Sequence, residues 1–209
     1  MSMIPFDLNL ITNFRALVFD LDGTLVDSMP AHNRAWQQVL SDCGALVTEQ
    51  ELYQLAGTPN MATAKIFIER FQLTATPEDI VTEKESLFEK SLGSLRVIPS
   101  VAAIAEQFYS EKPLAIVSGS TRSRITETLA ATGLSHLFQR IVSCEDTPEG
   151  KPHPAPFLLG AKLLKAPPHE CLVFEDGEAG IIGAIAAQMS VVYVKQGQLF
   201  ERSITQARV

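Results

Sequence analysis

The sequence predicts an α/β protein, with a parallel sheet between two layers of helices and a second, all-helical domain inserted into it. Short apolar runs recur along the 209 residues, at positions 15–19, 113–117, 140–143, 171–174 and 191–194. The runs are apolar rather than alternating, which is typical of strands that are covered on both faces. Helical patterns separate them, and strands that alternate with helices form parallel sheets with right-handed crossovers. We therefore expect a three-layer α/β/α core.

The segments between the strands carry apolar residues at the three- and four-residue spacing of amphipathic helices. Residues 97–108 have this spacing and precede the second strand. Three further helices are expected after the later strands. We assign the following residues to their buried faces rather than to a site: Ile125, Leu129, Phe157, Leu158, Ala161, Leu164, Ile182, Ile185, Ala186 and Met189.

The interval between the first two strands is much longer than a crossover with one helix requires. Thr58-Pro59 and Thr76-Pro77 have the pattern of a capping residue followed by proline in the first helical turn. Residues 28–95 are predicted to form a small helical domain, and residues 1–27 and 96–209 the α/β core. Three helices are expected in the insertion, with these apolar faces: Trp36, Val39, Leu40 and Cys43; Ala64, Phe67, Ile68 and Phe71; Ile80, Lys84, Leu87 and Phe88.

The composition restricts the possible partners and compartment. The chain has 17 Lys and Arg against 24 Asp and Glu, a formal net charge of -7, with no basic run. It therefore offers no electrostatic footprint for nucleic acid or an anionic membrane, and we expect neither as a partner. Three cysteines without a CxxC motif fit a reducing compartment. No apolar stretch is long enough to span a bilayer and no signal-peptide pattern is present, so we expect a cytoplasmic protein. We also expect a monomer or weak homodimer.

Acidic residues follow two of the predicted strands. Asp20 and Asp22 come after the first strand, and Glu175 and Asp176 after the strand at 171–174. Ligands of open parallel sheets bind beyond the carboxyl ends of the strands, which is where these acids lie. If the two strands are neighbours, their carboxylates converge and repel one another unless a cation lies between them. Mg²⁺ is favoured, because it needs only one or two carboxylates together with water and a substrate phosphate.

Groups that suit a phosphate follow the other strands. Ser118, Gly119 and Ser120 end the second strand ahead of a helix, where hydroxyls and free N–H groups bind phosphate oxygens. Lys151, after the third strand, adds a positive charge. A metal, hydroxyls, amides and an ammonium group directed at one point are the components of a phosphoryl-transfer site.

Four segments resemble, in order and context, the motifs of the haloacid dehalogenase-like phosphatase superfamily. They are DLDGTLVDS (20–28), VSGS (117–120), GKPHPAP (150–156) and VFEDGEAGI (173–181). The chain is most similar to the branch of β-phosphoglucomutases and small sugar phosphatases. The resemblance covers nearly the whole chain and implies a Rossmann-like core with an inserted helical cap. The segment MPAHNRAWQQVL (29–40) also resembles the start of the cap in bacterial fructose-1-phosphate phosphatases.

The resemblance implies catalytic roles for two aspartates. Asp20 would be the nucleophile that forms an aspartyl-phosphate. Asp22 would protonate the leaving alcohol and then activate water as a base. The chemistry of the residue types agrees, because a metal-bound carboxylate can attack phosphorus in line while a second carboxyl group moves the proton. Dehalogenases and phosphonate hydrolases of the superfamily lack an acid at the position of Asp22, so its presence favours phosphate ester chemistry.

The resemblance also implies the ligands of the metal and the phosphate. Mg²⁺ would be bound by Asp20, the backbone carbonyl of Asp22 and Asp176, with Glu175 as a fourth ligand or as a partner of the ligands. The phosphoryl oxygens would be held by Ser118, Gly119 and Lys151. His32, at the mouth of the site, would contact the substrate. A lone histidine at a helix start is also often structural.

Three functions are compatible with these motifs. Hexose phosphate mutases share every core motif, but they also hold a second phosphate with basic residues of the cap. The corresponding segment, LAGTPNMAT (55–63), has no Lys or Arg before Lys65, and a dianion without a cationic partner in a closed site is costly. We therefore predict a phosphatase for a small sugar phosphate, with a mutase as the alternative. A signalling receiver domain is more remote, since receivers are shorter and have no helical insertion.

Overall fold

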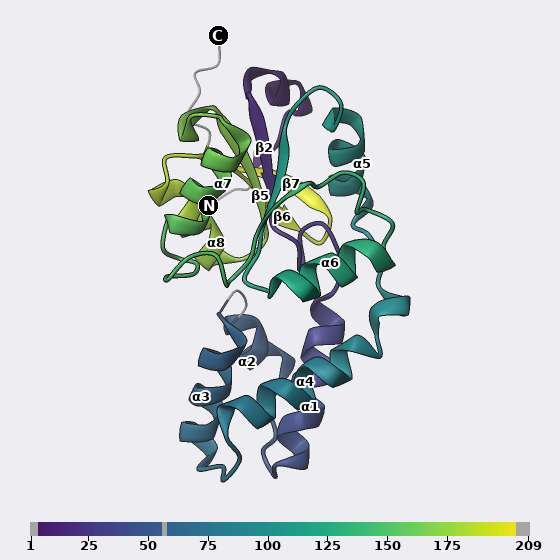
Figure 1. The fold of residues 1–209 in the computed structure, drawn as a ribbon, viewed down its shortest axis with the longest axis vertical. Coiled ribbons are helices and arrows are strands. Elements are labelled where there is room, and N and C mark those ends of the chain that lie inside the picture. Colours follow the sequence, from purple (N-terminus) through teal and green to yellow (C-terminus); the bar gives the residue numbers. More distant parts are fainter. Residues whose placement is uncertain (1–3, 56–57, 204–209) are drawn as a thin grey trace.

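A single sheet lies at the centre of the larger lobe of the computed structural model, which describes residues 4–55 and 58–203 (Figure 1). Within these residues the sheet has seven strands in the order β1-β7-β6-β5-β2-β3-β4. The strands span the following residues: β1 Ile4–Pro5, β2 Ala16–Phe19, β3 Leu114–Val117, β4 Arg140–Val142, β5 Cys171–Glu175, β6 Ser190–Lys195 and β7 Gln198–Ser203.

The strands from β6 to β4 run parallel, as expected, and β2 lies between β5 and β3. One edge of the sheet differs from the prediction of a parallel sheet, because β7 pairs antiparallel with β6 and β1 antiparallel with β7. The reason is the two-residue turn between β6 and β7. Gln196 and Gly197 both have positive φ, 50° and 75°, which is the backbone of a tight hairpin.

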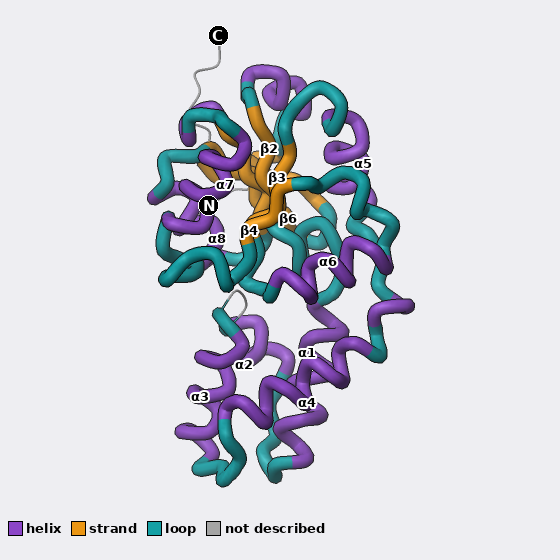
Figure 2. Tube along the Cα trace, viewed as in Figure 1, coloured by secondary structure: helices purple, strands orange, loops and turns teal. Residues whose placement is uncertain are grey.

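Helices cover both faces of the sheet, so the core has three layers (Figure 2). The side chains of β2 alternate between them: Leu17 and Phe19 join one apolar cluster, and Ala16 and Val18 join the other. All four residues of β2 are fully buried, as its continuous apolar run predicts. One layer contains α5 (Pro99–Phe108) and α6 (Arg122–Ala131), and the other contains α7 (Ala155–Leu164) and α8 (Glu178–Ala186).

The buried face predicted for α8 is largely wrong. Ile182 and Ile185 are exposed, and the buried face instead contains Gly180, Ile181, Gly183 and Ala184. The small residues let the helix approach the sheet closely; a Cβ on Gly183 would touch the ring of Phe157 at 3.0 Å. In α7 the same spacing places Phe157, Ala161 and Leu164 correctly inside, whereas Leu158 is exposed. Apolar spacing alone does not distinguish the two sides of a helix that is apolar all round.

A second, helical lobe is inserted between β2 and β3, below the sheet in Figure 1. In the described residues it contains α1 (Met29–Asp42), α2 (Glu49–Gln54), α3 (Asn60–Phe71) and α4 (Pro77–Glu89). It has its own apolar cluster, which includes most of the predicted faces. Short 3-10 helices complete the chain at Leu8–Asn13, Leu92–Ser94 and Pro168–Glu170. None of the helices described in either lobe has both the length and the apolar character needed to cross a membrane.

The insertion has one helix more than the sequence predicted. The short α2 was missed, although Thr48 and Glu51 form a reciprocal capping box at its start. Helix α4 begins as predicted, with the Thr76 hydroxyl accepting a hydrogen bond from the backbone N–H of Asp79 at 3.2 Å. Helix α3 begins one residue later than predicted, at Asn60, because Pro59 occupies the capping position.

Candidate active site

The carboxyl ends of β2 and β5 bring three acidic side chains together. Val18 of β2 pairs with Val173 of β5, so the residues that follow the two strands leave the sheet side by side. Asp20, Glu175 and Asp176 each offer a carboxylate oxygen, and these atoms all lie within 4.8 Å of one another. The convergence predicted from the strand ends is therefore present in the structure.

Lys151 is the cation within this cluster. It comes from the loop between β4 and α7, and its Nζ donates hydrogen bonds to Oδ1 of Asp20 at 2.7 Å and to Oε2 of Glu175 at 2.6 Å. The second oxygen of Glu175 accepts a bond from the backbone N–H of Gly177 at 3.1 Å. Burial disfavours the ammonium charge, but the two carboxylates outweigh it and raise the pKa of Lys151 above its usual value. Both oxygens of Glu175 thus have protein partners.

One lysine does not balance the negative charge of the cluster. Burial and the nearby Glu175 raise the pKa of Asp20 to about 7. Burial and Asp20 raise the pKa of Asp176 to about 7 as well, although the Thr24 hydroxyl donates to Oδ1 of Asp176 at 2.9 Å. Burial and Asp176 also raise the pKa of Glu175. An additional cation would relieve this repulsion.

The cluster has the chemistry and the space for a divalent cation. Its donors are carboxylate oxygens, which Mg²⁺ and Ca²⁺ prefer, and their mutual distances allow one shared ion. Gly23 supports the arrangement, because it adopts a φ of 87° and a Cβ there would overlap Oδ2 of Asp176. Only glycine gives the turn after β2 both the conformation and the close approach to Asp176.

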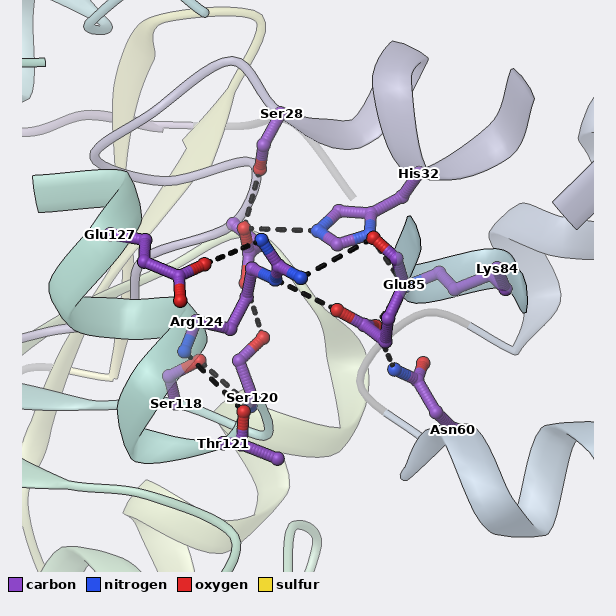
Figure 3. A network of polar contacts seen from close by, with 11 residues as sticks. Ser28, His32, Asn60, Lys84, Glu85, Ser118, Ser120, Thr121, Arg124 and Glu127 are labelled. Carbon is purple, nitrogen blue, oxygen red and sulfur yellow. Dashed lines mark hydrogen bonds and ion pairs between the residues drawn. The ribbon is translucent and has the colours of Figure 1, made fainter. Parts of the chain in front are cut away.

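The carboxylate of Asp22 is bound by three donors of its own. Its Oδ1 accepts from the Ser28 hydroxyl at 2.6 Å and from Nε2 of His32 at 3.3 Å, and its Oδ2 accepts from the Ser120 hydroxyl at 2.9 Å. Figure 3 shows Ser28 and His32, from the start of α1, and Ser120, from the loop after β3, converging on one point. Burial alone would raise the pKa of Asp22, but His32 and the two hydroxyls lower it below its usual range. Asp22 is therefore held as a carboxylate.

His32 lies between Asp22 and a buried lysine of the cap. Its Nδ1 is 2.9 Å from Nζ of Lys84, and its ring stacks on Phe88 with 3.9 Å between ring centroids. An ammonium group has only donors, so Nδ1 accepts and Nε2 carries the proton that is directed at Asp22. Burial and Lys84 lower the pKa of His32, which favours this neutral tautomer. The sequence placed His32 at the substrate, and it does line the cavity, but its polar contacts are with Asp22 and Lys84.

Ser118 and Gly119 lie at the end of β3, on the same cavity as Asp20 and Lys151. Ser118 is buried, and its Oγ accepts a bond from the backbone N–H of Ser120 at 3.1 Å, which leaves its own proton for another acceptor. Ser120 differs from the expectation of a phosphate contact, because its hydroxyl donates to Asp22. All four predicted phosphate and substrate residues, Ser118, Gly119, Lys151 and His32, therefore line one cavity.

This cavity lies between the strand ends and the cap. The core contributes the charged groups described above. The cap contributes apolar side chains and neutral polar groups, and Lys151 is the only Lys or Arg among the described lining residues. The lining residues of the cap are Met29, His32, Asn33, Trp36, Leu52, Leu55, Thr58, Asn60 and Thr63.

Several polar residues of the site were not predicted. Ser28 and Thr24 lie within the first motif but were assigned no role. Lys84 was placed on the apolar face of a helix, and its side chain is in fact buried there. A lysine at such a position is itself a signal, because a fully buried lysine requires a partner. The identity of that partner depends on the packing of α1 against α4, which the sequence does not specify.

The fold and site define a hydrolase class with a Rossmann-like α/β core, an inserted helical cap and an acidic cluster at the carboxyl edge of its sheet. The sequence profile of the haloacid dehalogenase-like hydrolases matches residues 17–194. The chain belongs to this family, as the four motifs predicted.

Relatives and structural neighbours agree with this assignment. The chain is 34% identical over 183 residues to the fructose-1-phosphate phosphatase YqaB of Escherichia coli, covering 87% of this chain and 97% of that protein. It is 31% identical over 186 residues to hexitol phosphatase A of the same organism, covering 86% and 82% of the two chains. The crystal structure of β-phosphoglucomutase from Clostridium difficile superimposes with a TM-score of 0.80 at 24% identity, covering 87% and 85%. This last likeness is one of fold.

Proposed function

We propose that the protein is a Mg²⁺-dependent phosphatase that hydrolyses a small sugar phosphate through an aspartyl-phosphate on Asp20. The observation that carries the proposal is the arrangement of Asp20 between Lys151 and the acidic cluster, in the same cavity as the hydrogen-bonded carboxylate of Asp22. A nucleophile, a proton carrier and a cation for the phosphate thus border one cavity.

The metal ligands follow from the donor set. Asp20, Asp176 and the backbone carbonyl of Asp22 would hold Mg²⁺, and Glu175 would complete the cluster by holding Lys151 in place. When bound, the ion supplies positive charge to the phosphoryl oxygens and relieves the repulsion between the carboxylates.

The residues of the chain account for both halves of the reaction. In the first, an Oδ atom of Asp20 forms a bond to phosphorus while the bond to the sugar oxygen breaks, and Asp22 donates a proton to that oxygen. In the second, Asp22 accepts a proton from water, whose oxygen attacks phosphorus and releases Asp20. The three hydrogen bonds favour the ionised Asp22 that the second half needs. The negative charge of an arriving phosphate raises the proton affinity of Asp22 for the first half.

The cavity favours one phosphate over two. Lys151 is its only Lys or Arg among the described lining residues, and it lies at the core end. The cap side offers amides and hydroxyls, which suit the hydroxyl groups of a sugar. The prediction that the cap has no second phosphate site was made on residues 55–63. Two of these, residues 56–57, lie outside the described part of the chain. The printed names of the two Escherichia coli relatives, a fructose-1-phosphate and a hexitol phosphatase, support the same substrate class.

The test is a screen for phosphate release from hexose, pentose and hexitol monophosphates, including fructose 1-phosphate, with Mg²⁺ and with EDTA. We expect turnover of at least one sugar phosphate with Mg²⁺ only, and none with Asp20→Asn. Asp42→Asn, which changes an exposed acid at the end of α1, serves as the matched control. Isomerisation of β-glucose 1-phosphate to glucose 6-phosphate faster than phosphate release would instead identify a mutase.

A further inference from the structure

An ion pair that the proposed reaction does not use joins the cap to the core. Arg124 of α6, in the core, donates from Nε to Oε2 of Glu85 in α4 of the cap at 2.8 Å, and from Nη2 to the backbone carbonyl of Glu85 at 3.3 Å. Figure 3 shows the two side chains facing each other between the lobes. The Arg124 side chain is only 10% exposed, and its guanidinium carbon lies 5.2 Å from the centre of the Phe88 ring. The Glu85 side chain is 25% exposed, so the pair is partly buried.

The other oxygen of Glu85 binds two donors of the cap. Its Oε1 accepts from Nζ of Lys84 at 2.7 Å and from Nδ2 of Asn60 at 2.7 Å. Both donors lead to the active site. Lys84 contacts His32, which in turn contacts the carboxylate of Asp22, and Asn60 lines the cavity directly.

The chemistry of Glu85 fixes the orientation of Asn60. The pKa of Glu85 is lowered by Lys84 and Arg124 against the effect of burial, so it is a carboxylate and accepts only. The amide of Asn60 must therefore turn its NH₂ group toward Glu85. This leaves the carbonyl oxygen and the second N–H of Asn60 for other partners, a combination that can accept from and donate to one hydroxyl group.

We propose that Glu85 and Arg124 are positioning residues: their ion pair sets Asn60 to bind a hydroxyl of the sugar and sets Lys84, through His32, to orient Asp22. The proposal rests on the proposed function for the reaction that it serves. Arg124 belongs to the core, whereas Glu85, Asn60 and Lys84 belong to the cap. The orientations of Asn60 and Lys84 therefore both depend on the contact between the lobes. Breaking a buried ion pair leaves an uncompensated charge, so its loss is felt by the groups that share the carboxylate.

Kinetics with two kinds of substrate test the proposal. Arg124→Met keeps a long unbranched side chain and removes the charge, and Glu85→Gln removes the charge of the other partner. We expect each variant to lower kcat/KM for the sugar phosphate about 10- to 100-fold, the loss of one charge-assisted hydrogen bond. For p-nitrophenyl phosphate, which has no sugar hydroxyls and a leaving group that needs no proton, we expect kcat/KM to fall less than about threefold. This ratio reports only the first half of the reaction, so the role of Asp22 in the hydrolysis of the aspartyl-phosphate does not enter it.

Glu127→Gln is the matched control. Glu127 accepts from Nη1 of Arg124 at 2.7 Å and from the Ser123 hydroxyl at 2.8 Å, and all three residues lie on α6 of the core. We expect its kinetics to remain within about twofold of the wild type on both substrates. Equal losses on the two substrates in Arg124→Met would show that the pair only maintains the fold, and no loss on either would also overturn the proposal. If Glu85→Gln does not fold, Arg124→Met alone decides.

Fluorescence of Trp36 gives a readout that does not depend on the sugar. It is the only tryptophan of the chain, is 6% exposed, and lines the cavity from the cap side. Acrylamide should quench it more strongly in Arg124→Met and Glu85→Gln than in the wild type or Glu127→Gln, because the cap is held less firmly. Unchanged quenching would contradict the proposed contact between the lobes. A wild type that hydrolyses p-nitrophenyl phosphate but no sugar phosphate would refute the proposed substrate class, while the quenching comparison would still decide the role of the pair.

Discussion

The ammonium group of Lys151 donates a hydrogen bond to the carboxylate of Asp20 over 2.7 Å, although the two residues are 131 positions apart in the chain. The pair joins the loop after β4 to the end of β2, and a second bond at 2.6 Å adds Glu175 of β5. Lys151 thus holds the ends of two neighbouring strands together and places a positive charge beside the proposed nucleophile.

Lys151→Met tests this double role. Without the ammonium group, the buried carboxylates of Asp20 and Glu175 lose their cationic partner, and breaking such a pair typically costs about 3–5 kcal/mol. For a chain of this size, 3 kcal/mol corresponds to a Tm lower by roughly 6–12 °C, measured in EDTA by differential scanning calorimetry. Phosphatase activity should fall by at least about two orders of magnitude. A variant of unchanged activity would remove Lys151 from the proposed phosphate site.

Gly23→Ala tests the fit between the turn after β2 and the metal ligands. The φ of 87° disfavours alanine, and its Cβ would overlap Oδ2 of Asp176, so the side chain must move. We expect the increase in Tm that Mg²⁺ produces in the wild type to be lost or strongly reduced. The matched control is Gly93→Ala, where a Cβ meets nothing within 4 Å. An increase in Tm with Mg²⁺ that is the same in Gly23→Ala as in the wild type would show that the ion does not depend on the position of Asp176 beside Gly23.

The acidic cluster predicts an unusual pH dependence of stability in EDTA. Folding raises the pKa of Asp20 and of Asp176 from 3.8 to about 7, so the folded state binds protons more tightly than the unfolded state. The contribution of these two carboxyl groups to the free energy of unfolding is therefore greatest at low pH and is lost as the pH rises through 7. Tm should therefore decline between pH 6 and pH 8 in EDTA, and less steeply in Asp176→Asn.

Mg²⁺ should oppose the decline of Tm with rising pH, because protons and the ion compete for the same carboxylates. The increase in Tm at a fixed Mg²⁺ concentration should grow from pH 6 to pH 8. An increase that is the same at both pH values would show that the ion binds elsewhere.

The position of the site was predictable because it depends on topology alone. A buried apolar strand followed by Asp20, and another followed by Asp176, place both acids at one edge once the strands are known to be parallel. The antiparallel edge was not predicted, because its signal is the local conformation of Gln196 and Gly197 rather than a pattern of apolar residues. The same limit led to the wrong face of α8, where Ile182 is exposed and Gly183 is buried.

The contacts between the lobes could not be predicted in the same way. Glu85 and Arg124 lie on different helices, and neither has a periodic pattern that identifies its partner. The pairing depends on how α4 packs beside α6, which is a property of the assembled molecule. Lys84 was the one indication, because a lysine on an apolar helix face must find a partner when it is buried.

Asn60→Ala tests the hydroxyl contact that we propose for the cap. The variant removes a carbonyl acceptor and an N–H donor from the cavity but leaves Asp20, Asp22 and Lys151 unchanged. Loss of one neutral hydrogen bond corresponds to about 0.5–1.5 kcal/mol, so we expect kcat/KM for the sugar phosphate to fall roughly 3- to 10-fold, mainly through a higher KM. The kinetics of p-nitrophenyl phosphate should not change.

Lys65→Ala, on the exposed side of the same helix, is the matched control for Asn60→Ala, and it should match the wild type on both substrates. Comparison of sugar phosphates that each lack one hydroxyl would then identify the group that Asn60 binds. The deoxy substrate that loses nothing further in Asn60→Ala is the one from which that hydroxyl is missing, since the contact is already absent. If every deoxy substrate is impaired by Asn60→Ala to the same extent as the parent sugar phosphate, Asn60 makes no direct contact and its effect is transmitted through Glu85.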